Sequence, residues 1–560
     1  GMAVDLPQQF HPPPWFVGMA AFGAMPVYDA IIVGSGMAGL MCARKLLDSG
    51  VPADKVLVLE AQDYIGGRVK QDEDFIKGNK IELGAEFIHG SASEAYNIGK
   101  ALKLPMQELF CTAQGDGGPD EKPVKGGYSL YYQSEGSQLL RFDSEEAEFS
   151  RTNESLWEML TMDASKIPEE QSMLDLFEQR DFTENMRRMA TAGFSNTLCA
   201  NSAELSLKQM ARWTQAWEHD EGEYCLEGSY AVIVDHLRRG VTVEVSTPVA
   251  RVDYSTAHSD PTTPSVDPAA PTAPATPAVA APTPVVMVTT SSGQRYHTRC
   301  VVVTASAHVM QAGLIDFCPP LPATVVDAYA CLKMNPAMKI LLCFTQCPWP
   351  THVQGMICAG TGVPEFWFNE FVDGTDGQKR YVAVGYCAAE YVSRQRETEC
   401  EEETKGVRCV TEDRAAQEQG MVRRTMEQLG MMMALLKPEH MKAEAGMGSE
   451  ADVAAMPSAE SCFEKGQVYE WSPTTHPYVG GGYASPLAGH SVLYAQTLAA
   501  PLRDEGAGGA GKGALVLFAG EATALKAGAT VEAAMESGLR AAAQVKRELG
   551  IKNKSKCSVS

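Results

Sequence analysis

The chain has 560 residues, of which 45% are hydrophobic and 21% are charged, and its formal net charge at pH 7 is −23. This length accommodates two or more domains with large cores, and the composition is that of an ordinary globular protein. The negative charge argues against nucleic acid or anionic membranes as partners and would attract cationic molecules, although acidic segments that keep the surface soluble are the simpler explanation.

The N-terminal segment 1–27 is interpreted as a tail. Its apolar stretch at 15–25 lacks a basic leading region, so we expect it to pack on the body and not to direct secretion. Other uncharged runs are shorter than the roughly 18 apolar residues that span a bilayer, so no membrane span is predicted. The 15 cysteines follow no framework spacing, which favours reduced thiols in a cytoplasmic or other reducing compartment. Cys343 and Cys347 lack a second pair, so no metal site is predicted.

A glycine-rich turn follows the first apolar run, at residues 30–33, and reads Gly34-Ser35-Gly36-Met37-Ala38-Gly39. Gly34 lets the chain turn sharply out of a strand, and Gly36 lets the backbone approach a pyrophosphate. Gly39 lets the following helix pack closely on the sheet, so that the N–H groups at its N-terminus point at the phosphates.

A second apolar run at 56–59 ends in Glu60, which lies 21 residues beyond Gly39. An acidic residue there accepts hydrogen bonds from the ribose hydroxyls of an adenosine. The isolated glycine motif is weak evidence, but a strand before it, a helix after it and an acid ending the next strand form the required context. The sequence therefore predicts a dinucleotide site.

Residues 259–284 are rich in proline, alanine and threonine and cannot bury enough apolar surface to become ordered. Short β-type runs flank them at 249–254 and 285–290. We therefore expect a disordered loop at the tip of a β-hairpin, not a linker between domains. A charged segment at 393–418 runs into a predicted helix at 421–436 and is interpreted as a surface elaboration, with partner binding as the alternative.

Several further motifs carry a family resemblance. They are Gly66-Gly67-Arg68, the segment 82–90 (ELGAEFIHG), the segment 517–523 (LFAGEAT) and the segment 529–538 (ATVEAAMESG). Together these motifs resemble the flavin-containing amine oxidase family, which includes polyamine oxidases, monoamine oxidases, L-amino-acid oxidases and lysine-specific histone demethylases. The resemblance implies FAD as the cofactor. No cysteine lies between Phe518 and Gly538, which argues for non-covalent FAD.

The resemblance also implies an α/β fold: a Rossmann-like FAD-binding domain with a β-meander, and an inserted α+β substrate-binding domain. The FAD-binding domain would be discontinuous and built from 28–90, 228–310 and 466–550. The substrate-binding domain would comprise 91–227 and 311–465, and residues 551–560 would form a C-terminal tail.

Lys339 is the first candidate for catalysis. It is the one charged residue in the strand-like run 336–344, and a lysine among apolar neighbours costs energy unless it is paired or used. In the family, a lysine in the matching strand contacts the flavin N5 through a water. The alternative is a lysine on an edge strand with its ammonium in solvent.

The resemblance assigns further residues to the cofactor. Glu521 matches the family's acidic residue at the ribityl–phosphate portion, and Thr530 and Val531 open a helix whose N–H groups face the polar edge of the isoalloxazine. The expected cofactor-binding set is Gly34, Gly36, Gly39, Glu60, Arg68, Gly84, Ala85, Glu86, Val249, Trp471, Glu521, Thr530 and Val531.

Aromatic residues and a histidine complete the expected site. Trp471 would pack beside the flavin, and Tyr483 would form one wall of an aromatic slot, because ring faces attract cations and apolar walls favour the neutral amine. Core packing is the alternative for each. His89 would face the substrate channel and help deprotonate a substrate nitrogen, or would be a structural histidine near the cofactor. Thr530 would stand at the slot's second wall.

Two further positions depart from the family pattern: Glu532 stands where a histidine is usual, and Ser229 where a glycine is usual. The sequence predicts an FAD-dependent oxidase of a primary or secondary amine, most closely a polyamine, with O₂ as co-substrate and H₂O₂ as product. The alternatives are an L-amino-acid oxidase, which would need an arginine such as Arg212 facing the flavin, and a catalytically silent flavoprotein scaffold.

Overall fold

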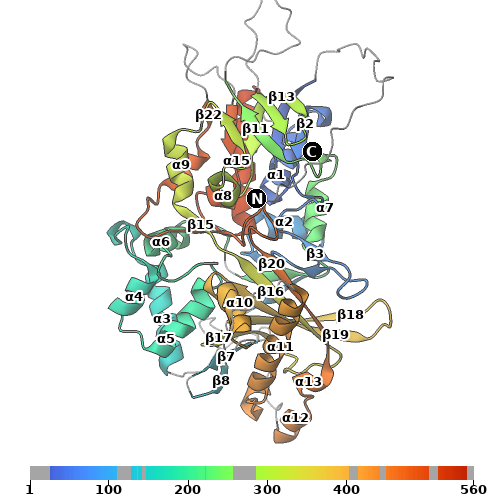
Figure 1. Cartoon of the computed structure of the whole chain (residues 1–560), viewed down its shortest axis with the longest axis vertical. Coiled ribbons are helices and arrows are strands. Elements are labelled where there is room, and N and C mark those ends of the chain that lie inside the picture. Colours follow the sequence, from blue (N-terminus) through green and yellow to red (C-terminus); the bar gives the residue numbers. More distant parts are fainter. Residues whose placement is uncertain are drawn as a thin grey trace, which may run out of the picture.

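The computed structural model describes residues 26–109, 128–134, 136–141, 147–220, 222–255, 286–402, 414–441, 449–503 and 515–551. The loop predicted at 259–284 and nearly all of both predicted tails lie outside these ranges. The described chain forms two large β-sheets with helices around them, one sheet in the upper and one in the lower half of Figure 1.

The upper sheet has a parallel core. Its strands run in the order β10, β2, β1, β13 and β23. Their bounds are β10 (Thr242–Glu244), β2 (Val56–Leu59), β1 (Val27–Val33), β13 (Arg295–Val303) and β23 (Leu515–Phe518), with β22 (Leu502–Arg503) antiparallel at the edge. Because both faces of such a sheet are covered, its central strands contain continuous apolar and buried runs, at 30–33, 56–59, 300–303 and 515–518.

One face of this sheet is covered by α1 (Met37–Asp48) and α15 (Val531–Glu548), which pack together over alternate strand residues. The two helices cross closely, because a Cβ added at Gly538 would lie 2.3 Å from the carbonyl oxygen of Ala38. Strands from both ends of the sequence therefore meet under one helix pair.

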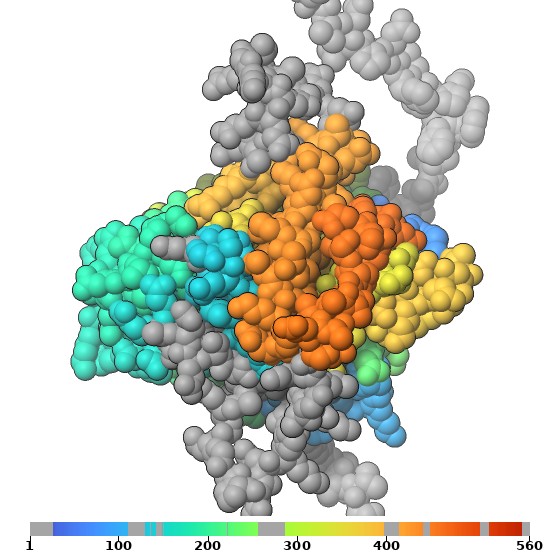
Figure 2. All heavy atoms as spheres, turned by 90° about the horizontal axis from the view of Figure 1, so that it is seen from below, coloured from blue at the N-terminus to red at the C-terminus, as the bar shows by residue number. Residues whose placement is uncertain are grey.

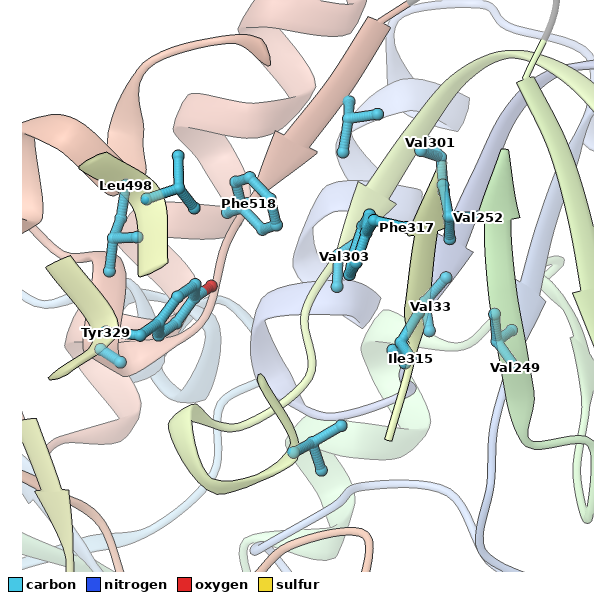
Figure 3. Packing of buried hydrophobic residues seen from close by; sticks show 14 of the residues in the cluster. Val33, Val249, Val252, Val301, Val303, Ile315, Phe317, Tyr329, Leu498 and Phe518 are labelled. Atoms are coloured by element: carbon cyan, nitrogen blue, oxygen red, sulfur yellow. The ribbon is translucent and has the colours of Figure 1, made fainter. Parts of the chain in front are cut away.

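The predicted β-hairpin is confirmed. Strand β11 (Val249–Asp253) pairs antiparallel with β12 (Val286–Thr290), which pairs antiparallel with β13 to form the β-meander. Strand β14 (Asp316–Cys318) continues this part of the sheet. Figure 3 shows the core that fills the second face, where the Tyr329 ring stands edge-on to Phe518. Helices α8 (Ala307–Gln311), α9 (Ala323–Ala330) and α14 (Tyr494–Ala499) cover it.

The lower sheet has seven strands in the order β20, β16, β19, β18, β17, β7 and β8, antiparallel except between β17 and β7. Their bounds are β20 (Phe463–Trp471), β16 (Ala337–Phe344), β19 (Lys379–Ala388), β18 (Glu365–Val372), β17 (Val353–Ala359), β7 (Tyr128–Gln133) and β8 (Gln138–Arg141). The domain boundary expected at residue 466 falls inside β20. This strand pairs with β16, whose eight residues are all buried and therefore need partners on both sides.

Helix α11 (Arg414–Met433) packs against one face of the lower sheet and contains most of the predicted helix 421–436. Figure 2 shows the molecule from below. Helices α11 to α13 (orange) lie between a group of cyan and teal helices on one side and the yellow β18–β19 hairpin on the other. Helix α12 spans Glu450–Ala454 and α13 spans Ala459–Cys462, while α10 (Glu390–Glu402) precedes α11 in the chain. The helical group is α3 (Ala147–Leu160), α4 (Met173–Gln179), α5 (Glu184–Ala190) and α6 (Leu207–Ala216).

Short elements join the two halves. Strand β9 (Glu223–Leu226) pairs with β5 (Phe87–His89) and β6 (Met106–Leu109), and this register places His89 opposite Glu223. The remaining short elements are α2 (Glu94–Ala101), α7 (Ala231–Leu237), β3 (Gln71–Asp72), β4 (Ile81–Glu82), β15 (Leu332–Met334) and β21 (Ala484–Pro486). Within the described ranges, no helix combines the length and apolar character needed to cross a membrane.

Candidate active site

A cavity of about 1660 Å³ extends from the glycine turn of the upper sheet to the face of the lower sheet. Sites for small molecules usually occupy roughly 300–1,000 Å³, so this cavity has room for a dinucleotide and a second small molecule. Of the residues predicted to form the site, all but Gly39 line it. Gly39 has a packing role instead, because a Cβ there would lie 2.1 Å from the carbonyl oxygen of Gly34.

The glycine turn fits a pyrophosphate. Gly34 has φ +105°, which only glycine adopts without strain, whereas Gly36 has φ −68° and its added Cβ would meet nothing within 4 Å. Gly36 is also the N-cap of α1 and offers no side-chain hydrogen bond. The first N–H groups of this 12-residue helix are therefore free of side-chain caps at the cavity wall.

Glu60 lies at the end of β2 beside this turn. The N–H and hydroxyl of Ser35 donate to Glu60 Oε2 at 2.6 and 2.7 Å, and the N–H of Gln62 donates to Oε1 at 2.8 Å. These bonds hold the carboxylate at the cavity wall, which Val249 also lines, in the place expected for ribose recognition.

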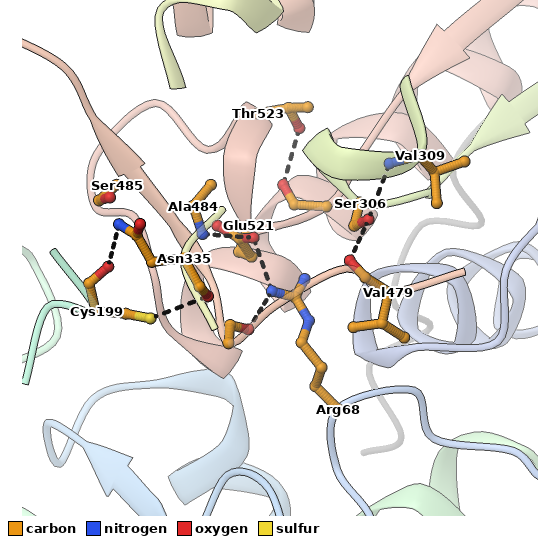
Figure 4. A network of polar contacts seen from close by, with 12 residues as sticks. Arg68, Cys199, Ser306, Val309, Asn335, Val479, Ala484, Ser485, Glu521 and Thr523 are labelled. Atoms are coloured by element: carbon orange, nitrogen blue, oxygen red, sulfur yellow. Dashed lines mark hydrogen bonds and ion pairs between the residues drawn. The ribbon is translucent and has the colours of Figure 1, made fainter. Parts of the chain in front are cut away.

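Arg68 and Glu521 connect motifs that are 453 residues apart. Arg68 Nη1 donates to Glu521 Oε1 at 3.0 Å, as Figure 4 shows. The same nitrogen donates to the Gly482 carbonyl at 2.8 Å. The N–H of Ala484 also donates to Glu521 Oε1, at 3.3 Å. Glu521 Oε2 is buried and has no hydrogen-bond partner among the described residues. A buried acceptor left unsatisfied at a cavity wall fits a donor on a bound ligand.

Lys339 lies on β16, between β19 and β20, and its side chain is only 5% exposed. The edge-strand alternative is therefore wrong. Its Nζ donates to Glu86 Oε2 at 2.8 Å and to the Glu82 carbonyl at 2.9 Å. Because an ammonium has three donors, these two bonds leave one N–H for the cavity.

Glu86, expected to bind the cofactor, is the counter-ion of Lys339. Trp367 Nε1 and Asn369 Nδ2 also donate to it, each at 2.8 Å. The neighbouring Gly84 is required sterically, because its Cβ would lie 1.8 Å from the Arg68 carbonyl oxygen. Trp471 lies next to this segment, and its Nε1 donates to the Leu83 carbonyl at 2.9 Å.

An aromatic pair forms the wall beyond Lys339. The hydroxyls of Tyr483 and Tyr386 are 3.0 Å apart, and Tyr483 also donates to the Thr197 carbonyl. Burial raises the pKa of both phenols well above the usual value. Both therefore stay protonated and act as hydrogen-bonding walls. Tyr386 and Trp367 were not predicted, because no sequence motif marks them.

His89 forms an ion pair with Glu223, at 2.6 Å between Nδ1 and Oε2. Burial lowers its pKa, but the hydrogen bond and charge of Glu223, with the charge of Glu532, raise the pKa of His89 to about 9. An imidazolium held in this way cannot accept a proton from an ammonium at neutral pH. The geometry favours the second expected role, a histidine held near the cofactor.

The two unusual residues each have a structural partner. Ser229 donates to Glu82 Oε1 at 2.7 Å, beside the N–H of Tyr230. Glu532 lies in the first turn of α15 and accepts from the His89 N–H at 3.3 Å. Thr530 caps this helix through the Ala533 N–H. The described residues contain no group of three or more metal-ligating side chains.

The fold is α/β, and the cavity has the glycine turn and the space that a dinucleotide needs. A family model described as "Flavin containing amine oxidoreductase" matches residues 37–546, and the chain belongs to this family. The cofactor is FAD. The N-terminus of α1, the open side of Gly36 and the unsatisfied Glu521 Oε2 all fit it, and the cavity lining in the described ranges includes no cysteine.

Among curated proteins, Lysine-specific histone demethylase 2 of Homo sapiens is 26% identical over 380 residues, which cover 66% of this chain and 41% of that protein. Polyamine oxidase 4 of Oryza sativa subsp. japonica is 22% identical over 348 residues, which cover 59% of this chain and 62% of that protein. The chain thus matches less than two thirds of the length of either relative.

Two solved structures share the fold. Cyclohexylamine oxidase from Brevibacterium oxydans IH-35A has a TM-score of 0.65 at 18% identity, covering 94% of this chain and 100% of that chain. Wild-type putrescine oxidase bound to putrescine has a TM-score of 0.64 at 16% identity, covering 93% and 99%.

Proposed function

We propose that this protein is an FAD-dependent oxidase of an aliphatic primary or secondary amine, with a polyamine as the preferred class. The observation that carries the proposal is the buried ammonium of Lys339, which lines the same cavity as the dinucleotide turn. Its hydrogen bonds to described residues use two of its three N–H groups. Bound FAD would accept a hydride from the carbon next to the amine nitrogen and pass two electrons to O₂, giving H₂O₂. The resulting imine is hydrolysed by water to an aldehyde, with release of ammonia from a primary amine or of a smaller amine from a secondary one.

The residues of the chain would provide position and electrostatics for this reaction. Lys339 directs its third N–H to a fixed point in the cavity, where it orients a water molecule. Glu86 holds that ammonium in place. Tyr386 and Tyr483 present rings to the substrate, and such apolar walls favour the neutral amine that can lose a hydride.

The charges of the cavity support a cationic substrate. Among the residues that the structure describes, its lining has seven carboxylates and three Lys or Arg side chains. Negative potential in a cleft of low dielectric concentrates cations and raises their association rate. Polyamines and other ammonium compounds match this potential better than molecules that carry a net negative charge.

An L-amino-acid oxidase is the second candidate, and one observation keeps it open. Such an enzyme needs a cation to bind the substrate carboxylate. Arg212 is not part of the cavity lining, but Arg141, at the end of β8, is. If Arg141 held a carboxylate, an Arg141→Met variant would lose amino-acid turnover while amine turnover stayed intact.

The direct test is peroxide release by the purified yellow protein. Spermine, spermidine, acetylated polyamines, tyramine and several amino acids are supplied in turn, and flavin bleaching is followed without oxygen. We expect bleaching and peroxide with a polyamine. A flavin-loaded protein that neither bleaches nor releases peroxide with any of these compounds would instead be a silent scaffold.

A further inference from the structure

A row of three polar side chains crosses the lower sheet at the floor of the cavity. Lys339 on β16 is directly opposite Tyr386 on β19, and Tyr386 is directly opposite Glu365 on β18. Residues directly opposite one another share a face of the sheet, and all three line the cavity. Glu365 therefore lies at the far end of a line that begins at the candidate catalytic ammonium.

Glu365 differs in its partners from three other carboxylates of this cavity. Glu86, Glu521 and Glu223 each lie beside a cation, namely Lys339, Arg68 and His89. Glu365 has no lysine, arginine or histidine within 4 Å among the described residues. From the described part of the chain, its Oε2 accepts two long hydrogen bonds, from Asn196 Nδ2 and Thr197 Oγ1, both at 3.3 Å.

This environment leaves the carboxylate energetically unsatisfied. Burial raises the pKa of Glu365 to about 7, despite the hydrogen bonds from Thr197 and Asn196. Ionising a carboxyl in such a place costs free energy, and a cation brought beside it recovers that energy. The neighbouring phenols of Tyr386 and Tyr483 are neutral and supply no charge.

We propose that Glu365 is a subsite for a second ammonium group of the substrate, so that the oxidised compound is a linear diamine or polyamine and not a monoamine. The proposal rests on the proposed amine oxidase function. Two strand spacings separate Lys339 from Glu365, about 10 Å between backbones. A chain of four or more carbons between nitrogens spans such a distance once a contact of roughly 3 Å is allowed at the carboxylate.

The test compares 1,5-diaminopentane with pentylamine, which has the same carbon chain and lacks the second nitrogen. In the holoenzyme we expect kcat/KM to be at least tenfold higher for the diamine. Glu365→Gln keeps the size and the acceptor for Asn196, and should abolish this preference mainly through KM, with pentylamine unchanged. Glu370→Gln is the matched control, because Glu370 lies on the same strand but pairs with Lys379 outside the cavity.

A second variant uses the geometry of the row. Glu365→Asp withdraws the carboxylate by one carbon, so the preferred diamine should become longer, from 1,5-diaminopentane towards 1,6-diaminohexane. An unchanged ratio of diamine to monoamine in Glu365→Gln, in protein that melts as the wild type does, would overturn the subsite.

Calorimetric binding of 1,5-diaminopentane to the holoenzyme separates the subsite from the oxidase function. Binding that weakens at least tenfold in Glu365→Gln supports the subsite even if no amine is oxidised, and in that case only the oxidase proposal fails. Turnover of both amines with no dependence on Glu365 keeps the oxidase function and refutes the subsite.

Discussion

Lys339 Nζ and Glu86 Oε2 lie 2.8 Å apart, with side chains only 5% and 10% exposed. Lys339 belongs to β16 of the lower sheet, and Glu86 directly precedes β5, in the segment that follows the dinucleotide motif. A buried charge pair is costly to break, because the partner that remains is left uncompensated in a medium of low dielectric. This pair therefore joins the cofactor region to the substrate region and fixes one ammonium between them.

Substitution of this pair separates its catalytic contribution from its structural one. Lys339→Met should lower kcat/KM for the amine by roughly 10²-fold, the usual effect of losing one preorganised donor. It should also destabilise the protein by about 3 kcal/mol, because Glu86 is left unpaired. Adding Glu86→Gln should recover part of the melting temperature without recovering activity. If activity returned together with stability, Lys339 would be a structural residue only.

Gly36→Val should separate cofactor binding from folding. The valine side chain would enter open space at the cavity wall, where the φ of −68° suits any residue. We expect near-normal circular dichroism but a flavin-to-protein absorbance ratio reduced at least tenfold. Gly39→Ala is the matched control and should impair folding, because its Cβ would lie 2.1 Å from the Gly34 carbonyl. A Gly36→Val protein that stays fully yellow would contradict the assignment of this turn to the pyrophosphate.

The charge on His89 should depend on Glu223. The pKa of about 9 is above the ordinary value, so the stabilisation from the ion pair is complete below about 6.5 and is lost as pH rises through 9. Glu223→Gln removes the anion while burial remains, and should bring the pKa of His89 below about 7. NMR titration of ¹³C-labelled histidine would follow this change, with His89→Gln to assign the signal and Glu108→Gln as the control. Wild-type titration near 6.5 would exclude the ion pair.

Glu365 should make stability depend on pH in the opposite sense to an ordinary surface carboxylate. Its folded pKa of about 7 is above the ordinary value of 4.5 that it has in the unfolded chain, so its favourable contribution is complete below pH 4.5 and is lost as pH rises through 7. The free energy of unfolding of Glu365→Gln, measured relative to that of the wild type, should therefore increase by about 1–3 kcal/mol from pH 5 to pH 8.

Paired melting curves at the two pH values check this prediction. The thiols of Cys358 and Cys387 and the phenols of Tyr386 and Tyr483 are the titratable groups that interact with Glu365. Burial raises their pKa values, so they do not titrate in this range. Glu370→Gln should show no such gain, and an equal gain in that control would point to general charge repulsion.

The cofactor end of the cavity could be predicted from sequence because local motifs encode it. Gly34, Gly36 and Glu60 act within one strand–turn–helix–strand unit, and their spacing alone places them together. Arg68 and Glu521 were recognised separately by family motifs. The structure brings these residues to one cavity, while their roles toward FAD and those of Lys339 and Tyr483 stay predictions.

The substrate end could not be predicted, because its geometry depends on register between distant strands. Tyr386 and Glu365 belong to strands with no motif, and only the pairing of β16, β19 and β18 aligns them with Lys339. The same cause explains why the boundary expected at residue 466 falls inside β20. In sequence this strand is continuous with the cofactor segments, but its hydrogen bonds go to β16.

The pairing of Lys339 with Glu86 has a consequence for dividing the gene. If the chain were divided anywhere between residues 90 and 337, the two charges would lie on different polypeptides. Each charge would then be unpaired on a surface that is buried in the intact protein. Neither fragment should fold into a stable protein when it is produced alone. Production of both fragments in the same cell should give a complex that binds flavin and is yellow. This reassembly should fail when one fragment carries Glu86→Gln or the other carries Lys339→Met.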